Sequence, residues 1–209
     1  MMESATNLRE RRRQESAERL IELAREWTAR DGFTGYTVEE LCEAAGVSRR
    51  TFFNYFASKE DAVLGILAPH GDDELTQTFL DGGSSAGETI SDALVDDFVA
   101  LHLARWEIVA PSASDVRAMK AAIEREPRLH TRIFEMIQAN EQRDIALIEQ
   151  REHLEAGDLR ASTLVHIVGA FSRATAKEYF ADHGDAPPSI GHFSRIFEQR
   201  IAAARELLI

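Results

Sequence analysis

Apolar residues recur at every third or fourth position along most of the chain, a spacing that places them on one face of an α-helix. The first such stretch includes Ala17, Leu20, Ala24 and Trp27, and it ends near Gly32. The sequence lacks the sustained alternation that is typical of strands, and it lacks hairpin dipeptides at suitable spacing. The pattern therefore predicts an all-α protein of about nine helices.

Turn and capping residues predict two short helices after Gly32. Thr37 and Glu40 have the spacing of a capping box, in which each side chain binds the other residue's backbone N–H, and they open a helix that Gly46 ends. Ser48 is placed to cap the next helix, which continues to about residue 56. The two helices are thus predicted to meet across a tight glycine turn.

Further helices are predicted along the rest of the chain. Ser58 starts one that Pro69 and Gly71 interrupt or kink and that resumes toward Leu80, and residues 82–85 form a flexible link. Longer helical patterns, separated by proline and glycine breaks, follow at residues 88–109, 113–126, 128–152, 159–182 and 189–208.

The two short helices have the arrangement of a helix-turn-helix, whose second helix can lie in the major groove of DNA. Arg49 and Arg50 occupy the first turn of that helix, where Arg can form two hydrogen bonds with guanine. Phe52 and Phe56 are four residues apart on one face, which predicts packing on the preceding helix. Phe53 lies about 100° around the helix, where it would reach sugars or a thymine methyl group.

Residues 37–60 resemble the DNA-binding domain of the tetracycline-repressor (TetR) family, through Thr-Val-Glu-Glu-Leu and the later run GVSRRTFFNYFASKE. The resemblance implies that Ser48, at the start of the second helix, is one of the DNA-binding residues. It implies phosphate contacts from Thr37, Thr51, Tyr55 and Lys59, and base contacts from Arg49, Arg50 and Phe53. Family members commonly carry Tyr at the position of Phe53, so a hydroxyl contact from that position is lost here.

The family's architecture implies a DNA-binding domain over residues 1–60 and a larger helical domain over 61–209 that binds an effector and dimerises. A homodimer is expected because two recognition helices must reach successive major grooves of a palindromic site, about 34–36 Å apart. Two late helices suit such an interface, one through small residues and one through an apolar stripe: Gly169, Ala170 and Ala174, then Phe193, Ile196, Phe197, Ile201, Ala204 and Leu208. Either helix equally suits packing within one subunit.

A pocket for a small, largely apolar effector is expected among the middle helices. Its candidates are aromatic and flexible apolar side chains with polar neighbours: Phe98, His102, Trp106, Met119, Ile123, Phe134, Ile137, Asn140 and His166. The first three are four residues apart on one helix face. His102 is open to two interpretations, a ligand contact or a hydrogen-bonded residue of the core.

The net charge of −12, taken alone, argues against binding to nucleic acid. Residues 1–67, however, carry ten Lys and Arg against twelve Asp and Glu, whereas residues 68–209 carry fourteen against twenty-four. The locally basic segments are residues 8–13 and 46–59, and local positive charge is what a DNA surface needs. Residues 9–13, with Arg9, Arg11, Arg12 and Arg13, are either a disordered solubilising arm or a segment that reaches the minor groove or backbone.

The sequence does not favour a redox, metal-binding, enzymatic or membrane-spanning role. Cys42 is the single cysteine and is expected to pack as a small apolar residue, with a redox sensor as the minor alternative. His70 with Asp72, Asp73 and Glu74 indicates a solvated turn, so neither a metal nor a cofactor is expected. No nucleophile motif or phosphate-binding loop indicates an enzyme. The apolar runs are too short to span a membrane, which favours the cytoplasm.

The sequence therefore favours a regulator that represses transcription as a DNA-bound homodimer and is released by an effector. An activator, or a DNA-binding protein that needs no effector, is the alternative.

Overall fold

The computed structural model describes residues 2–67, 73–83, 90–109, 113–180 and 190–208. Within these residues the chain forms ten α-helices, one short 3-10 helix and no strand, which confirms the all-α prediction. The chain divides into two compact units: residues 1–70 with 111–135, and residues 71–110 with 136–209. We call them unit 1 and unit 2. The domain boundary expected after residue 60 stays a prediction.

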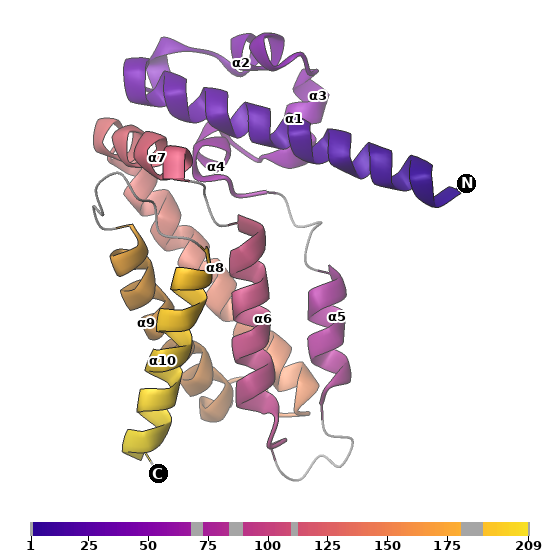
Figure 1. Ribbon diagram of the computed structural model, residues 1–209, viewed down its shortest axis with the longest axis vertical. Helices are drawn as coiled ribbons and strands as arrows, with labels where there is room; N and C mark the ends of the chain where they lie inside the picture. The colour runs from indigo at the N-terminus through magenta and orange to yellow at the C-terminus, as the bar shows by residue number, and fades with distance from the viewer. Residues whose placement is uncertain (1, 68–72, 84–89, 110–112, 181–189, 209) are drawn as a thin grey trace. The chain divides into compact units, whose positions relative to one another are not determined.

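Unit 1 contains the helix-turn-helix and two elements from later in the chain. Its elements are α1 (Met2–Asp31), η1 (Phe33–Gly35), α2 (Val38–Ala45), α3 (Arg49–Tyr55), α4 (Lys59–Leu64), α7 (Ala113–Arg125) and the first residues of α8 (Arg128–Arg151). Helix α7 lies alongside α1 (Figure 1). Side chains from all the helices of this unit and from η1 enclose a core that includes Leu20, Leu41, Phe52, Phe56 and Val63, all fully buried.

Two segments of unit 1 differ from the sequence-based expectation. Residues 9–13 lie inside α1, so this basic segment is helical rather than a disordered arm. Helix α4 ends at Leu64, before the expected break at Pro69 and Gly71, which lie outside the described residues. The physical reason is Gly65, whose left-handed backbone (φ 74°) closes the helix with an N–H bond to the Ala62 carbonyl.

Unit 2 consists of α5 (Asp73–Asp81), α6 (Leu94–Val109), the remainder of α8, α9 (Leu159–Tyr179) and α10 (Ile190–Leu208). Helix α10 packs against α9, and α5 packs against α6 (Figure 1). The Arg151 side chain is fully buried in this unit. Its guanidinium lies 4.4 Å from the Phe79 ring, donates to the Gly82 carbonyl at 2.9 Å, and is paired with Asp97 and Glu152.

Helix α6 starts later than the expected residue 88. Residues 90–93 are described and are not helical, because Ser91 donates both its backbone N–H and its hydroxyl to the Glu152 carboxylate, at 2.8 and 2.7 Å. Residues 84–85 of the expected flexible link lie outside the described residues. The other four long helices follow their predicted ranges to within three residues at each end.

Candidate functional site

The helix-turn-helix of unit 1 begins with the predicted capping box. The Thr37 hydroxyl accepts the backbone N–H of Glu40 at 3.1 Å, and the Glu40 carboxylate accepts the backbone N–H of Thr37 at 2.7 Å. These bonds hold the pKa of the Glu40 carboxyl below its usual value. Gly46 closes α2 in the left-handed region (φ 70°), with its N–H directed at the carbonyls of Cys42 and Glu43. The chain thereby turns directly into α3.

Helix α3 presents a mixed face of charged and aromatic side chains. The Ser48 hydroxyl caps the helix by accepting the Thr51 N–H at 3.1 Å, as predicted. Phe52 and Phe56 are fully buried with ring centroids 5.5 Å apart, which confirms their assignment to the core. Phe53 instead is 49% exposed. The first turn of the helix and one aromatic ring are therefore free to meet a partner.

Arg49 and Arg50 are both exposed at the start of α3. The Arg49 guanidinium pairs with the Glu39 carboxylate of α2 at 2.8 Å and lies 5.7 Å from the centroid of the Phe53 ring. Sequence reasoning missed Glu39, because no helical spacing relates two residues on opposite sides of the turn. The carboxylate and the ring together favour one orientation of the exposed Arg49 side chain.

The residues that the resemblance assigns to phosphate contacts have local partners. The Thr37 hydroxyl donates to Glu40 at 2.9 Å, and the Thr51 hydroxyl lies 2.8 Å from the Ser48 hydroxyl. The Tyr55 ring lies 5.9 Å from the Arg13 guanidinium of α1, which brings the basic segment of α1 next to α3. DNA contact from each of these residues stays a prediction.

Lys59, at the start of α4, is a structural residue as well as a candidate phosphate ligand. Its amine donates to the carbonyls of Phe33 and Tyr36, at 2.5 and 2.7 Å, and lies 4.3 Å from the centroid of the Tyr36 ring. Burial lowers the pKa of Lys59. An ammonium group has three donors, so a third remains for a phosphate. A Lys59→Ala change would consequently alter the fold of this loop as well as DNA binding.

Ion pairs connect α4 to the start of α8 within unit 1. Arg132 of α8 pairs with the buried Asp61 of α4 at 2.6 Å, and Arg128 lies 3.6 Å from Glu60. The Glu126 carboxylate accepts the backbone N–H of Phe33 at 2.7 Å. We call the Asp61–Arg132 pair the α4 clamp. It couples the helix that follows the recognition helix to residues far away in the sequence.

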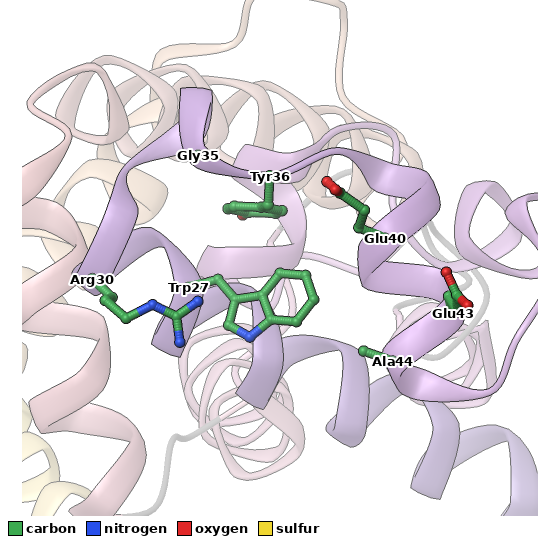
Figure 2. Close-up of a pocket in the computed structure, with 7 residues that line it drawn as sticks. All are labelled: Trp27, Arg30, Gly35, Tyr36, Glu40, Glu43 and Ala44. Carbon is green, nitrogen blue, oxygen red and sulfur yellow. The ribbon is translucent and has the colours of Figure 1, made fainter.

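A shallow hollow lies between α1, η1 and α2 in unit 1. Figure 2 shows the seven residues that line it, namely Trp27, Arg30, Gly35, Tyr36, Glu40, Glu43 and Ala44. The rings of Trp27 and Tyr36 meet edge to face, with centroids 5.5 Å apart. Two carboxylates in the lining would repel a phosphate backbone, so we do not assign this hollow to the DNA surface.

The candidate effector residues are distributed over both units. Ile123 of α7 packs against the core of unit 1, Met119 of the same helix is half-buried, and the Phe134 ring is 60% exposed. In unit 2, Ile137 and Asn140 are half-buried on α8 and His166 is exposed on α9. These assignments stay predictions.

The remaining three candidates, Phe98, His102 and Trp106, lie on α6 in unit 2. Phe98 is buried against Phe79 of α5, with ring centroids 5.9 Å apart. His102 and Trp106 instead stack on rings of α10: His102 on Phe197 at 5.3 Å, and Trp106 on Phe193 at 4.1 Å. Both α10 rings are fully buried. Phe193 and Phe197, which belong to the apolar stripe that was considered for the dimer interface, therefore pack inside one subunit.

Burial shapes the chemistry of His102 and Cys42. Desolvation, with a smaller effect of the Arg105 charge, lowers the pKa of His102 to about 4, so the imidazole is neutral at physiological pH. The Cys42 thiol is buried in the core of unit 1, and burial raises its pKa. A thiol with a raised pKa is a poor nucleophile, which favours a packing role for Cys42.

We looked for metal-binding clusters and membrane-spanning helices in the part of the chain that the structure describes, and found neither. No cluster of three or more His, Cys, Asp or Glu side chains there could hold a metal ion. His70 and Asp72 of the expected solvated turn lie outside that part. No helix within it is sufficiently long and apolar to cross a bilayer.

The turn between α2 and α3, with an exposed arginine pair at the start of the second helix, defines a helix-turn-helix DNA-binding protein. The sequence model of the family described as "Bacterial regulatory proteins, tetR family" matches residues 20–64. The match identifies these residues as a tetR-type helix-turn-helix and supports a DNA-binding transcriptional regulator, a class of proteins that are transcription factors rather than enzymes.

The chain is similar to two sequences that are described as bacterial transcriptional regulators. The HTH-type transcriptional regulator TcmR of Streptomyces glaucescens is 29% identical over 178 residues, which cover 83% of this chain and 76% of the relative. The "Putative mycofactocin biosynthesis transcriptional regulator MftR" of Mycobacterium tuberculosis is 38% identical over 60 residues, which cover 29% of this chain and 30% of the relative. The first similarity extends well beyond the helix-turn-helix.

Proposed function

We propose that this regulator is a repressor that binds a palindromic operator as a homodimer and is released by a small effector. The observation that carries the DNA-binding part is the exposed arginine pair, Arg49 and Arg50, at the start of α3. Guanine offers two acceptors in the major groove that match one guanidinium. The local positive charge suits phosphates even though the whole chain is acidic. Binding to DNA in the cytoplasm belongs to the same proposal.

The homodimer is supported by the outer face of α9. Ile167 is 37% exposed there, and Ala170 one turn away is also exposed. An apolar face with a small residue allows close approach of a second helix. Pairing through such a face would present two recognition helices to one palindromic site.

Release by an effector is supported by the α4 clamp. A rearrangement of the start of α8 would change the Asp61–Arg132 pair and would thereby act on α4, which follows α3 directly. An effector needs only a preference of a few kcal/mol for the conformation that does not bind DNA.

Selection of bound fragments from a random DNA pool by the purified full-length protein tests this proposal. We expect enrichment of a palindrome, a complex of two chains per site, and loss of sequence preference in Arg50→Ala. The expected cost is about 1–3 kcal/mol for each base-directed contact that is removed. Retention of specific binding in both Arg49→Ala and Arg50→Ala would show that α3 does not read the bases. A selected site that binds one chain would contradict the dimer.

A further inference from the structure

The segment between α1 and α2 holds the ammonium group of Lys59 in place. The Lys59 amine donates to the carbonyls of Phe33 and Tyr36, at 2.5 and 2.7 Å. A lysine side chain has a flexible four-carbon stem, so these two bonds decide where its charge lies. The position of the charge therefore depends on what holds the two carbonyls.

The two residues that supply these carbonyls are anchored to different parts of unit 1. The Tyr36 hydroxyl lies 2.8 Å from the Thr28 hydroxyl, which attaches Tyr36 to α1. Phe33 is attached instead to the turn between α7 and α8. Its backbone N–H donates to the Glu126 carboxylate at 2.7 Å, and the Arg128 guanidinium lies 4.1 Å from the centroid of its ring. One of the two acceptors is thus held by a side chain 93 positions later in the sequence.

The contact from Glu126 fills a place that the local sequence leaves open. Phe33 begins η1, and the first N–H groups of a helix have no acceptor within it. Gly32, which precedes η1, has no side chain that could cap it. Its left-handed backbone (φ 72°) leaves room for the carboxylate, because a Cβ at Gly32 would lie 2.7 Å from Glu126 Oε1. Gly32 and Glu126 thereby act together as the cap of η1.

We propose that Glu126 is a positioning residue for DNA binding: it holds Phe33, and through the Phe33 carbonyl it sets where Lys59 presents its charge to a phosphate. This inference rests on the proposed function, because it requires that Lys59 contacts the DNA backbone. The negative charge of Glu126 would itself repel DNA. Its contribution to binding is therefore the hydrogen bond and not the charge, and two variants can separate these effects.

Glu126→Gln and Glu126→Met test this role in the full-length protein. Both remove the charge, but only glutamine keeps an oxygen that accepts the Phe33 N–H. Affinity is measured against salt concentration on the duplex enriched by selection and on a scrambled duplex of the same length. On logarithmic axes the slope is about 0.9 for each phosphate that the protein neutralises. We expect Glu126→Gln to keep the wild-type slope, and Glu126→Met to lower it by about 0.9 for each bound chain and to weaken binding several-fold. Equal slopes for the two variants would overturn the proposal.

The slope also separates positioning from stability. A variant that is only less stable forms less complex, but the number of phosphates that each folded chain contacts stays the same. Thermal unfolding shows that each variant is folded at the temperature of the binding experiment. Glu124→Met removes a charge from an exposed position two residues away and should leave the slope unchanged.

A change at Lys59 shows whether Glu126 acts through this residue. Lys59→Met removes the ammonium group, so it should lower the slope at least as much as Glu126→Met does. Addition of Glu126→Met should then lower it no further, because residues that act through one contact are not additive. An unchanged slope in Lys59→Met, or a further fall in the double variant, would contradict the route through Lys59.

These results are distinguishable from a failure of the proposed function. If selection enriches no site, the sequence-specific regulator is contradicted, and the scrambled duplex still reports the salt slope, because phosphate contacts carry no sequence information. If a palindrome is enriched and bound by two chains, but Glu126→Gln and Glu126→Met share one slope, the regulator stands and the positioning role of Glu126 is wrong.

Discussion

Glu39 holds the guanidinium of Arg49 on the surface that we propose to face DNA. Both side chains are more than half exposed, so the pair contributes little to stability. We expect its effect on DNA binding to be larger, because the carboxylate would both orient Arg49 and repel nearby phosphates. We predict that Glu39→Gln tightens binding to unrelated DNA several-fold and lowers the ratio of specific to non-specific affinity. Fluorescence anisotropy on an operator and a scrambled duplex measures both.

A matched control for Glu39→Gln is available on the same helix. Glu43 is exposed on α2 and lines the hollow of Figure 2 rather than contacting Arg49. Glu43→Gln removes the same charge without releasing the arginine. If both variants lowered the specificity ratio equally, the effect would be one of overall charge, and Glu39 would have no positioning role.

His102 makes the stability of unit 2 depend on pH. Its pKa is about 4 in the folded chain and about 6.5 when unfolded, so the unfolded chain binds the proton more readily between these values. The contribution of neutral His102 is therefore complete above pH 6.5 and is lost as the pH falls toward 4. The loss is on the order of 3 kcal/mol. Urea unfolding at about pH 7 and pH 4.5 should show a smaller pH dependence for His102→Phe; an identical dependence would contradict the shifted pKa.

At the element scale, the turn between α2 and α3 depends on the left-handed backbone of Gly46. No atom lies within 4 Å of the position that a Cβ would occupy, so the effect of Gly46→Ala is conformational and not steric. We predict a loss of about 1 kcal/mol of stability. Thermal unfolding measures this loss. Ala44→Gly, at an exposed position of α2, is the control for helix propensity. A stabilised Gly46→Ala variant would show that the turn does not have this geometry.

The α4 clamp offers a second test at this scale. Arg132→Met removes the partner of the buried Asp61 carboxylate, which then has an uncompensated charge in the core of unit 1. We expect a loss of about 1–3 kcal/mol in urea unfolding, partly recovered when Asp61→Asn is added. Arg143→Met, at an exposed position of the same helix, should change stability little. No recovery in the double variant would show that the two residues are not coupled.

Local signals accounted for most of the helix-turn-helix, whereas contacts between distant residues did not follow from the sequence. Thr37, Ser48 and Gly46 act on atoms within four residues, so their spacing alone predicted the caps. The bonds of Lys59 to the Phe33 and Tyr36 carbonyls span more than twenty residues. A periodic pattern shows which face of a helix is apolar but not which helix covers it. For the same reason the sequence suggested His102 and Trp106 as site residues without identifying the α10 rings beside them.

At the scale of the whole molecule, the acidity of the chain is compatible with DNA binding because of where the charges lie. The net charge of −12 arises mainly after residue 67. Arg11, Arg12 and Arg13 lie on α1, and the last of them is next to Tyr55 of the helix that we propose to read DNA. An acidic remainder disfavours non-specific adhesion to DNA. We therefore expect sequence preference to rest on a small basic surface.

Homodimer formation through α9 is the prediction that belongs to the whole molecule. Ala170→Arg places a charged side chain on the exposed apolar face and should shift the protein from dimer to monomer in sedimentation experiments. Affinity for a palindromic operator should fall at least tenfold, because each half-site then binds independently. Gln77→Arg introduces the same charge at an exposed position of α5 and should change neither property. A dimer that persists in Ala170→Arg with full operator affinity would exclude this face of α9 as the interface.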